Sequence, residues 1–169
     1  QTVAVTVDNV SPVVVSIVKP AKIDEGESVE FIATATDAGV EDTLTYTWNF
    51  GDNTEQSSGK NVNHIFADNG NYNVVLTVTD KDGAVTTQTV TVAVDNVAPM
   101  VVLIIKPETI KEGESVTFAA TASDPGILDT LTYSWNFGDN TNPVIGRDVN
   151  HTFADNGNYN VVLTVTDKD

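Results

Sequence analysis

The chain is built from a repeat. Shifted by 87 residues, Gln1–Asp82 aligns with Gln88–Asp169 without a gap, and 59 of the 82 residue pairs are identical. The segment from Phe66 to Asp82 recurs unchanged at residues 153–169. Self-similarity at a fixed period is the signature of a structural unit that occurs more than once. The sequence therefore predicts two near-copies of one unit.

The repeat is out of phase with the ends of the sequence. Residues 1–7 (QTVAVTV) match residues 88–94 (QTVTVAV), the last strand-like segment of a unit. We therefore expect residues 1–9 to be the closing strand of a preceding repeat and residues 10–96 to be the first repeat. Residues 97–169 are then a second repeat that lacks its own last strand. A spare strand and an open sheet edge of matching sequence predict head-to-tail self-association through residues 1–7.

Apolar and polar side chains alternate within each unit. The alternation is clear in residues 28–36 (SVEFIATAT), 44–50, 72–78 and 90–94. A period of two predicts strands with one buried face, and clusters of Asp, Asn and Gly between them predict turns. About seven short strands per unit, with no helical period, predict an all-β protein of two tandem Ig-like antiparallel β-sandwiches.

Several polar and aromatic residues of each unit have an expected structural role. The lone Trp of a unit suits the core anchor of such a sandwich, and the Tyr after Asp-Asn-Gly-Asn suits a tyrosine corner, whose hydroxyl bonds upstream main chain. The Asp of each Gly-Asp-Asn turn is expected to accept bonds from main-chain amides. These residues are Trp48, Asp52, Tyr72, Trp135, Asp139 and Tyr159.

Composition removes several classes of function. Eight basic against 24 acidic residues give a net charge of −16, which argues against binding to a phosphate backbone. The absence of Cys excludes thiol catalysis and thiolate metal sites. No apolar run is long enough to span a bilayer. Without a G-x-S-x-G motif or a Ser in a suggestive context, His64 and His151 are expected to be buried structural residues, and we expect no enzymatic activity.

A resemblance to a known family rests on three motifs. Trp48-Asn-Phe-Gly-Asp-Asn53, then His64-x-Phe66, then a segment from Gly70 to Asp80 that reads G-x-Y-x-V-x-L-x-V-x-D, together resemble the PKD (polycystic kidney disease) domain. The second repeat carries the same set, so the resemblance covers essentially the whole chain. The departure is Asn in place of the final Gly of W-N-F-G-D-G, a mild change because Asn tolerates left-handed turn conformations.

Acidic residues are expected to gather at one end of each sandwich. In an antiparallel Ig-like sandwich, the loop after residues 28–36 and the loop after residues 72–78 lie beside the start of the first strand. Carboxylates packed in this way repel one another unless they are protonated or bridged by a cation, and Ca²⁺ takes oxygen ligands of this kind. The alternative is that these residues cap turns and keep a repeat protein soluble.

The resemblance implies particular calcium ligands, because some bacterial secreted enzymes have PKD domains that bind calcium at this end. Carried over by position, the ligands are Asn9, Asp37, Asp42, Asp80, Asn96, Asp124, Asp129 and Asp167. A second arrangement, at the junction of the repeats, resembles the calcium-rigidified linkers of cadherins and would use Glu25, Glu27 and Asp95.

The sequence thus favours a non-enzymatic structural and adhesive spacer of a secreted or cell-surface multidomain protein, in contact with neighbouring PKD repeats of its parent protein. One alternative is an accessory module that binds a polysaccharide or matrix protein beside a secreted hydrolase, which requires exposed aromatic residues. Another is a calcium-dependent homophilic adhesion domain. The resemblance implies an extracellular or cell-surface location.

Overall fold

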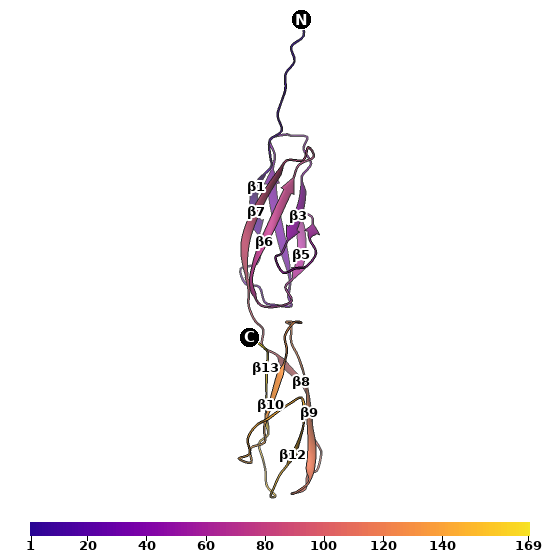
Figure 1. Ribbon diagram of the computed structural model, residues 1–169, viewed down its shortest axis with the longest axis vertical. Coiled ribbons are helices and arrows are strands. Elements are labelled where there is room, and N and C mark those ends of the chain that lie inside the picture. The colour runs from indigo at the N-terminus through magenta and orange to yellow at the C-terminus, as the bar shows by residue number, and fades with distance from the viewer. The chain divides into compact units, whose positions relative to one another are not determined.

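The computed structural model describes residues 1–169 and divides them into two compact units, Gln1–Asp95 (unit 1) and Asn96–Asp169 (unit 2). Every regular element is a strand (Figure 1). No helix is present that has the length and apolar character needed to cross a membrane. The prediction of an all-β fold is confirmed.

Unit 1 contains seven strands in two antiparallel sheets. One sheet has the order β1-β2-β5 and the other has the order β4-β3-β6-β7. Ten consecutive residue pairs join β6 to β7, from Gly70↔Val94 to Thr79↔Val85. The strands are β1 (Val13–Val18), β2 (Ser28–Thr36), β3 (Thr45–Asn49), β4 (Ser57–Ser58), β5 (Asn61–Ile65), β6 (Gly70–Thr79) and β7 (Val85–Val94).

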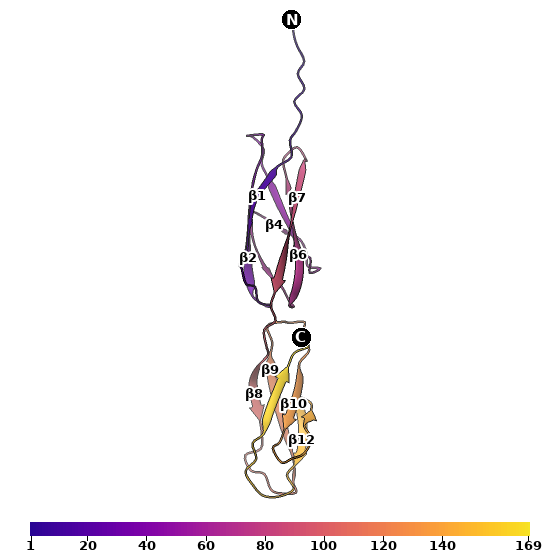
Figure 2. The same cartoon turned by 90° about the vertical axis from the view of Figure 1, so that its left-hand side faces the viewer.

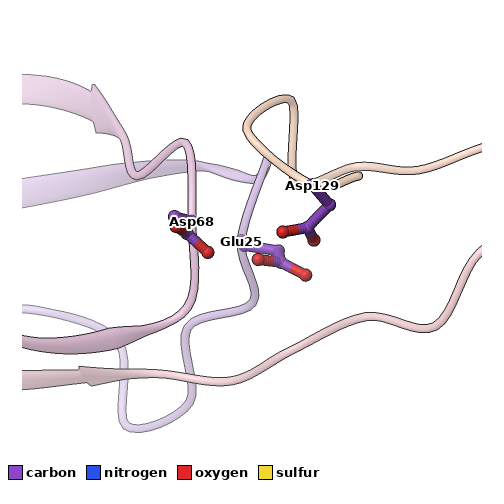
Figure 3. Close-up of side chains that lie close together, drawn as sticks. All are labelled: Glu25, Asp68 and Asp129. Carbon is purple, nitrogen blue, oxygen red and sulfur yellow. The ribbon is translucent and has the colours of Figure 1, made fainter. Parts of the chain in front are cut away.

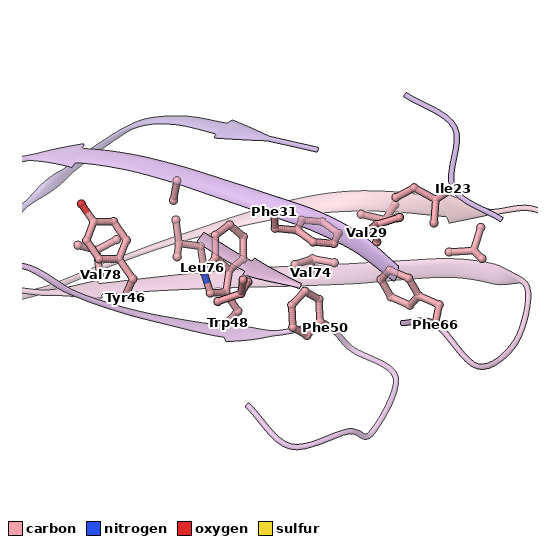
Figure 4. Packing of buried hydrophobic residues seen from close by; sticks show 14 residues of the cluster. Ile23, Val29, Phe31, Tyr46, Trp48, Phe50, Phe66, Val74, Leu76 and Val78 are labelled. Carbon is pink, nitrogen blue, oxygen red and sulfur yellow. The ribbon is translucent and has the colours of Figure 1, made fainter. Parts of the chain in front are cut away.

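The alternating side chains of these strands form the core of unit 1. Phe31 of β2, Trp48 of β3 and Leu76 of β6 are fully buried between the two sheets (Figure 4). Along β2, polar side chains such as that of Glu30 point away from the core, so buried and exposed positions alternate along the strand. Burial of aromatic side chains of this size is a main source of the stability of such a domain.

Trp48 and Tyr72, which the sequence predicts to anchor the core of unit 1, both donate hydrogen bonds to main-chain oxygens. Trp48 Nε1 donates to the main-chain oxygen of Gly59 at 2.9 Å, and the Tyr72 hydroxyl donates to that of Asp68 at 2.8 Å. Asn53 has a φ of 66°, so it takes the left-handed conformation that Gly favours at this turn. Tyr72 therefore makes the hydroxyl bond that a tyrosine corner requires, and Asn53 accommodates the left-handed turn.

Unit 2 repeats the arrangement with six strands. Its sheets have the orders β12-β9-β8 and β11-β10-β13 (Figure 2). Trp135 Nε1 donates to Gly146 O at 3.0 Å, and the Tyr159 hydroxyl donates to Asp155 O at 2.9 Å. The strands are β8 (Met100–Ile105), β9 (Ser115–Ser123), β10 (Thr132–Asn136), β11 (Val144–Ile145), β12 (Asp148–Thr152) and β13 (Val162–Thr166).

One strand distinguishes the two units. Unit 1 has β7 beside β6, whereas β13, the counterpart of β6, pairs only with β10. Residues 1–7, whose sequence matches β7, form no strand and extend away from the sandwich of unit 1 (Figure 1). Within residues 1–169, β7 is thus the one strand of unit 1 that has no counterpart in unit 2.

Candidate metal site

Three segments of unit 1 that are distant in sequence meet at one end of its sandwich. They are the segment that enters β1, the loop between β2 and β3, and the loop between β6 and β7. Asn9 Nδ2 donates to Asp80 Oδ2 at 3.0 Å, which joins the first segment to the third. Asp37, Asp42 and Asp80 each offer a carboxylate oxygen, and these oxygens lie within 4.8 Å of one another. The sequence-predicted set of Asn9, Asp37, Asp42 and Asp80 is thus assembled in unit 1.

Asp80 organises the loop that follows β6. Its Oδ1 accepts bonds from the amides of Asp82 and Ala84, both at 2.9 Å, and the residue is 4% exposed. Burial raises the pKa of Asp80, but the bonds from Asn9 and from these amides outweigh it, so its pKa lies below the ordinary value. Asp80 is therefore a carboxylate at neutral pH.

The loop between β2 and β3 brings the other two carboxylates inward. Asp37 Oδ1 accepts a bond from Gly39 N at 2.8 Å, and Asp42 N donates to Gly39 O at 2.9 Å. A Cβ at Gly39 would lie only 2.3 Å from Asp42 Oδ2, so glycine allows the loop to close over this side chain. Asp37 Oδ2 is buried and accepts no hydrogen bond. Such an oxygen is costly to bury unless a cation satisfies it.

A lysine lies against the same cluster. Lys81 Nζ contacts Asp42 Oδ1 at 2.5 Å and Asp82 Oδ2 at 2.5 Å, and the Asp42 side chain is 5% exposed. These hydrogen bonds raise the pKa of Lys81 above its ordinary value. The ammonium group therefore offsets one of the three negative charges of Asp37, Asp42 and Asp80.

Unit 2 repeats several of these contacts. Asn96 Nδ2 donates to Asp167 Oδ2 at 3.2 Å, and Asp124 Oδ1 accepts a bond from Gly126 N at 2.8 Å. Lys168 pairs with Asp129, whose side chain is fully buried. The Oδ2 atoms of Asp124 and Asp129 are buried and accept no hydrogen bond. Asn96 and Asp167 are thus brought together, and Asp129 is placed against a lysine.

The residues expected at the junction of the repeats are only partly assembled within unit 1. Glu25, on the turn before β2, is buried. One of its carboxylate oxygens lies within 4.8 Å of a carboxylate oxygen of Asp68, which is on the turn before β6 (Figure 3). Glu27 and Asp95 are exposed, and Asp95 contacts Glu25 through its main chain, with Glu25 N donating to Asp95 O at 3.1 Å. Asp129, also drawn in Figure 3, belongs to unit 2.

Each unit also contains a buried acid–imidazole pair. His64 Nε2 lies 2.6 Å from Asp52 Oδ2, and the His64 ring stacks on Phe50 with centroids 3.7 Å apart. Burial raises the pKa of Asp52, but bonds from Thr54 and His64 outweigh it, so the pKa is lowered. Asp52 also accepts a bond from Thr54 N at 3.2 Å, the kind of Asp–amide bond expected at this turn. The pair itself was not predicted.

In unit 2 the corresponding pair is His151 and Asp139, with His151 Nε2 2.7 Å from Asp139 Oδ2. Bonds from Thr141 and then from His151 lower the pKa of Asp139 to about 2. The recurrence of Asp and His twelve residues apart in both repeats was the available sequence signal. Both pairs lie against core aromatics, which indicates a structural role.

Two antiparallel sheets with these motifs define the class of Ig-like β-sandwich modules, and comparison with known proteins gives the family. A family model described as the PKD domain matches residues 9–94 and again residues 96–169. The chain therefore belongs to the PKD domain family and contains two tandem PKD domains.

Two solved structures illustrate the similarity. The PKD1 domain of Vibrio anguillarum Epp is 31% identical, with a TM-score of 0.44, and the match covers 52% of this chain and 98% of that domain. The PKD1 domain of the Vibrio cholerae metalloprotease PrtV is 29% identical, with a TM-score of 0.43, and the match covers 51% of this chain and 99% of that domain.

Proposed function

We propose that the chain is a non-enzymatic spacer and adhesive segment of a secreted or cell-surface multidomain protein, and that Ca²⁺ at the acidic end of each unit stiffens it. Tandem PKD domains support a spacer, because near-identical units present the same ends to their neighbours. Pro99, near the start of the second matched domain and just before β8, limits backbone freedom there.

The buried, unpaired Asp37 Oδ2 carries the calcium proposal. It belongs to a set of three carboxylates whose oxygens converge within 4.8 Å, and such an all-oxygen set suits Ca²⁺. Asn9 completes the set when its amide turns its Oδ1 toward the cation. Asn96, Asp124, Asp129 and Asp167 are the proposed ligands in unit 2, where two further buried carboxylate oxygens lack a hydrogen bond.

The accessory ligand-binding alternative is less well supported. Polysaccharide-binding surfaces use exposed aromatic rings, and all twelve aromatic residues (six Phe, four Tyr and two Trp) are buried or half-buried. Tyr46 is 8% exposed and Phe66 is fully buried. Neither unit therefore has the aromatic platform that this function needs.

Calcium titration tests the proposal directly. Isothermal titration of the full chain with CaCl₂ should show binding, and addition of EDTA should lower the melting temperature. A ligand at a hundred times its dissociation constant stabilises the native state by about 2.7 kcal/mol. Asp37→Asn should weaken binding in unit 1 about tenfold or more, because it removes a ligand charge.

The matched control is Glu30→Gln, which removes the same charge from an exposed position in the middle of β2. It should leave calcium affinity unchanged. Absence of a binding heat, together with a melting temperature that EDTA does not alter, would overturn the calcium proposal. Calcium-dependent self-association in sedimentation would support the adhesive role, and a monomer with and without calcium would count against it.

A further inference from the structure

Two asparagines of the chain begin an Asn-x-Ser/Thr sequence, the motif at which N-linked glycans are attached. They are Asn9, which is followed by Val and Ser11, and Asn150, which is followed by His and Thr152. The structure places the two side chains in different surroundings. It therefore distinguishes which of them can carry a glycan in the folded protein.

Asn150 lies in the middle of β12, and its motif is divided between the two faces of that strand. Val149 and His151 are buried, whereas Asn150 and Thr152 are exposed. Alternate residues of a strand share a face, so the Thr152 hydroxyl stands beside the Asn150 amide, about 7 Å along the strand. The acceptor amide and the hydroxyl that the motif requires are thus presented together on the outer face of the sheet.

The surroundings of Asn150 leave room for a bulky group. Thr117 Oγ1 of β9 donates to Asn150 Oδ1 at 2.7 Å, so the oxygen of the amide faces β9 and its nitrogen is turned away from that contact. β12 is the outermost strand of the sheet β12-β9-β8. Its counterpart β5 is outermost in the same way in unit 1, with its seven strands. A group attached to the Asn150 nitrogen therefore extends into solvent beside the edge of the sheet.

Asn9 is held in the acidic cluster instead. Its Nδ2 donates to Asp80 Oδ2 at 3.0 Å, and Asp80 is only 4% exposed. A glycan on this nitrogen would stand among the carboxylates of the candidate metal site and would strain the bond that joins the segment before β1 to the loop after β6. Asn150 is therefore the motif whose glycan the folded chain accommodates.

Unit 1 provides a matched position without the motif. Asn63 occupies the equivalent place in β5 and is exposed, as Asn150 is. The residue two positions further on is Ile65, where unit 2 has Thr152. Unit 1 thus has the amide but lacks the hydroxyl. A single residue separates an acceptor from a non-acceptor at the same place in the fold.

We propose that Asn150 carries an N-linked glycan. In the transfer, Asn150 Nδ2 loses a proton to solvent and forms a bond to C1 of an oligosaccharide, whose donor is a lipid-phosphate-linked oligosaccharide. The bond between C1 and the phosphate oxygen of the lipid carrier breaks, and its electron pair leaves with the carrier. The proposal rests on the extracellular location that is part of the proposed function, because this transfer acts on exported chains.

A glycan at this place has a physical consequence for unit 2. The outermost strand of a sheet presents unpaired main-chain groups with which another chain can pair. A bulky, hydrated glycan on Asn150 stands beside those groups of β12 and keeps other chains away from them. The modification therefore opposes edge-to-edge association along β12.

Mass spectrometry of tryptic peptides tests the proposal on residues 1–169 secreted from a eukaryotic host behind a signal peptide. Cleavage after Arg147 and Lys168 gives a peptide of residues 148–168, in which Asn150 begins the one acceptor motif. We expect this peptide to carry a glycan, and an amidase that removes the glycan should convert the asparagine to aspartate. The glycosylated chain and its Asn150→Gln variant should melt within a few degrees of each other, because the glycan lies on the surface.

Two exchanges between the repeats are the matched controls. Thr152→Ile, which copies unit 1, should abolish the modification, and Ile65→Thr, which copies unit 2, should create a second acceptor at Asn63. Both positions are exposed, so both variants should fold.

An unmodified peptide 148–168, modification at Asn9 alone, or modification that persists in Thr152→Ile would overturn the proposal. So would a glycosylated chain that melts far below Asn150→Gln, since the fold would then not accommodate the glycan. Calcium titration and the effect of EDTA are measured on the same chain, so an unmodified Asn150 leaves the calcium proposal standing.

Discussion

Replacing Asp139 by Asn tests whether the charge of the buried acid–imidazole pair stabilises unit 2. Asp139 Oδ1 accepts bonds from Thr141 N and Thr141 Oγ1 at 3.1 and 2.6 Å, and Asn retains an oxygen for them. The other oxygen, which faces His151 Nε2, becomes an NH₂ group. With side-chain exposures of 8% for His151 and 9% for Asp139, water replaces the lost partner poorly. The substitution exchanges a charge-assisted bond for a neutral bond or none.

The expected loss is about 1–2 kcal/mol of unfolding free energy at pH 7, the difference between a hydrogen bond to a charged group and a neutral one. For a domain of this size it corresponds to a melting temperature lower by about 4–16 °C. The folded-state pKa of Asp139 is about 2 and that of an unfolded Asp is about 3.9. Because the folded value is the lower one, the stabilisation is complete above about pH 4 and is lost as the pH falls through about 2.

Urea unfolding of the full chain at several pH values measures this effect. The control is Asp148→Asn, since Asp148 is exposed and its 3.6 Å pair with Arg147 lies at the surface, where such pairs contribute at most about 1 kcal/mol. The reasoning fails if Asp139→Asn unfolds at the same urea concentration as the unmodified chain at pH 7. It also fails if the difference between the two proteins persists at pH 2.

Two other predictions concern the metal site and the core. Lys81→Gln should raise the calcium affinity of unit 1 about tenfold in isothermal titration, because the ammonium group no longer competes for Asp42. Lys60→Gln, away from the cluster, is the control, and equal affinities for both variants would contradict competition. Leu76→Ala should cost about 2–5 kcal/mol in urea unfolding, as for other fully buried leucines. A loss below about 1 kcal/mol would contradict the reading of Leu76 as a core residue.

The sequence predicted the features that are encoded locally. Alternation along residues 28–36 gives β2, and the spacing around Tyr72 gives the tyrosine corner, because both depend on neighbouring residues. The meeting of Asp37 with Asp80 was also predictable, since strand order determines which loops share an end. The pairing of Asp52 with His64, and of Lys81 with Asp42, was not. Those contacts depend on how individual side chains of separate loops are oriented, which a single sequence does not specify.

The ten-residue ladder between β6 and β7 has a mechanical consequence. The chain enters unit 1 beside the end of β6 and leaves it from the end of β7 that pairs with the start of β6. A pull on the two ends therefore acts along the strands, at right angles to the hydrogen bonds that join them. The load is shared by the whole ladder at once instead of opening one pair at a time, so unit 1 resists extension through shear.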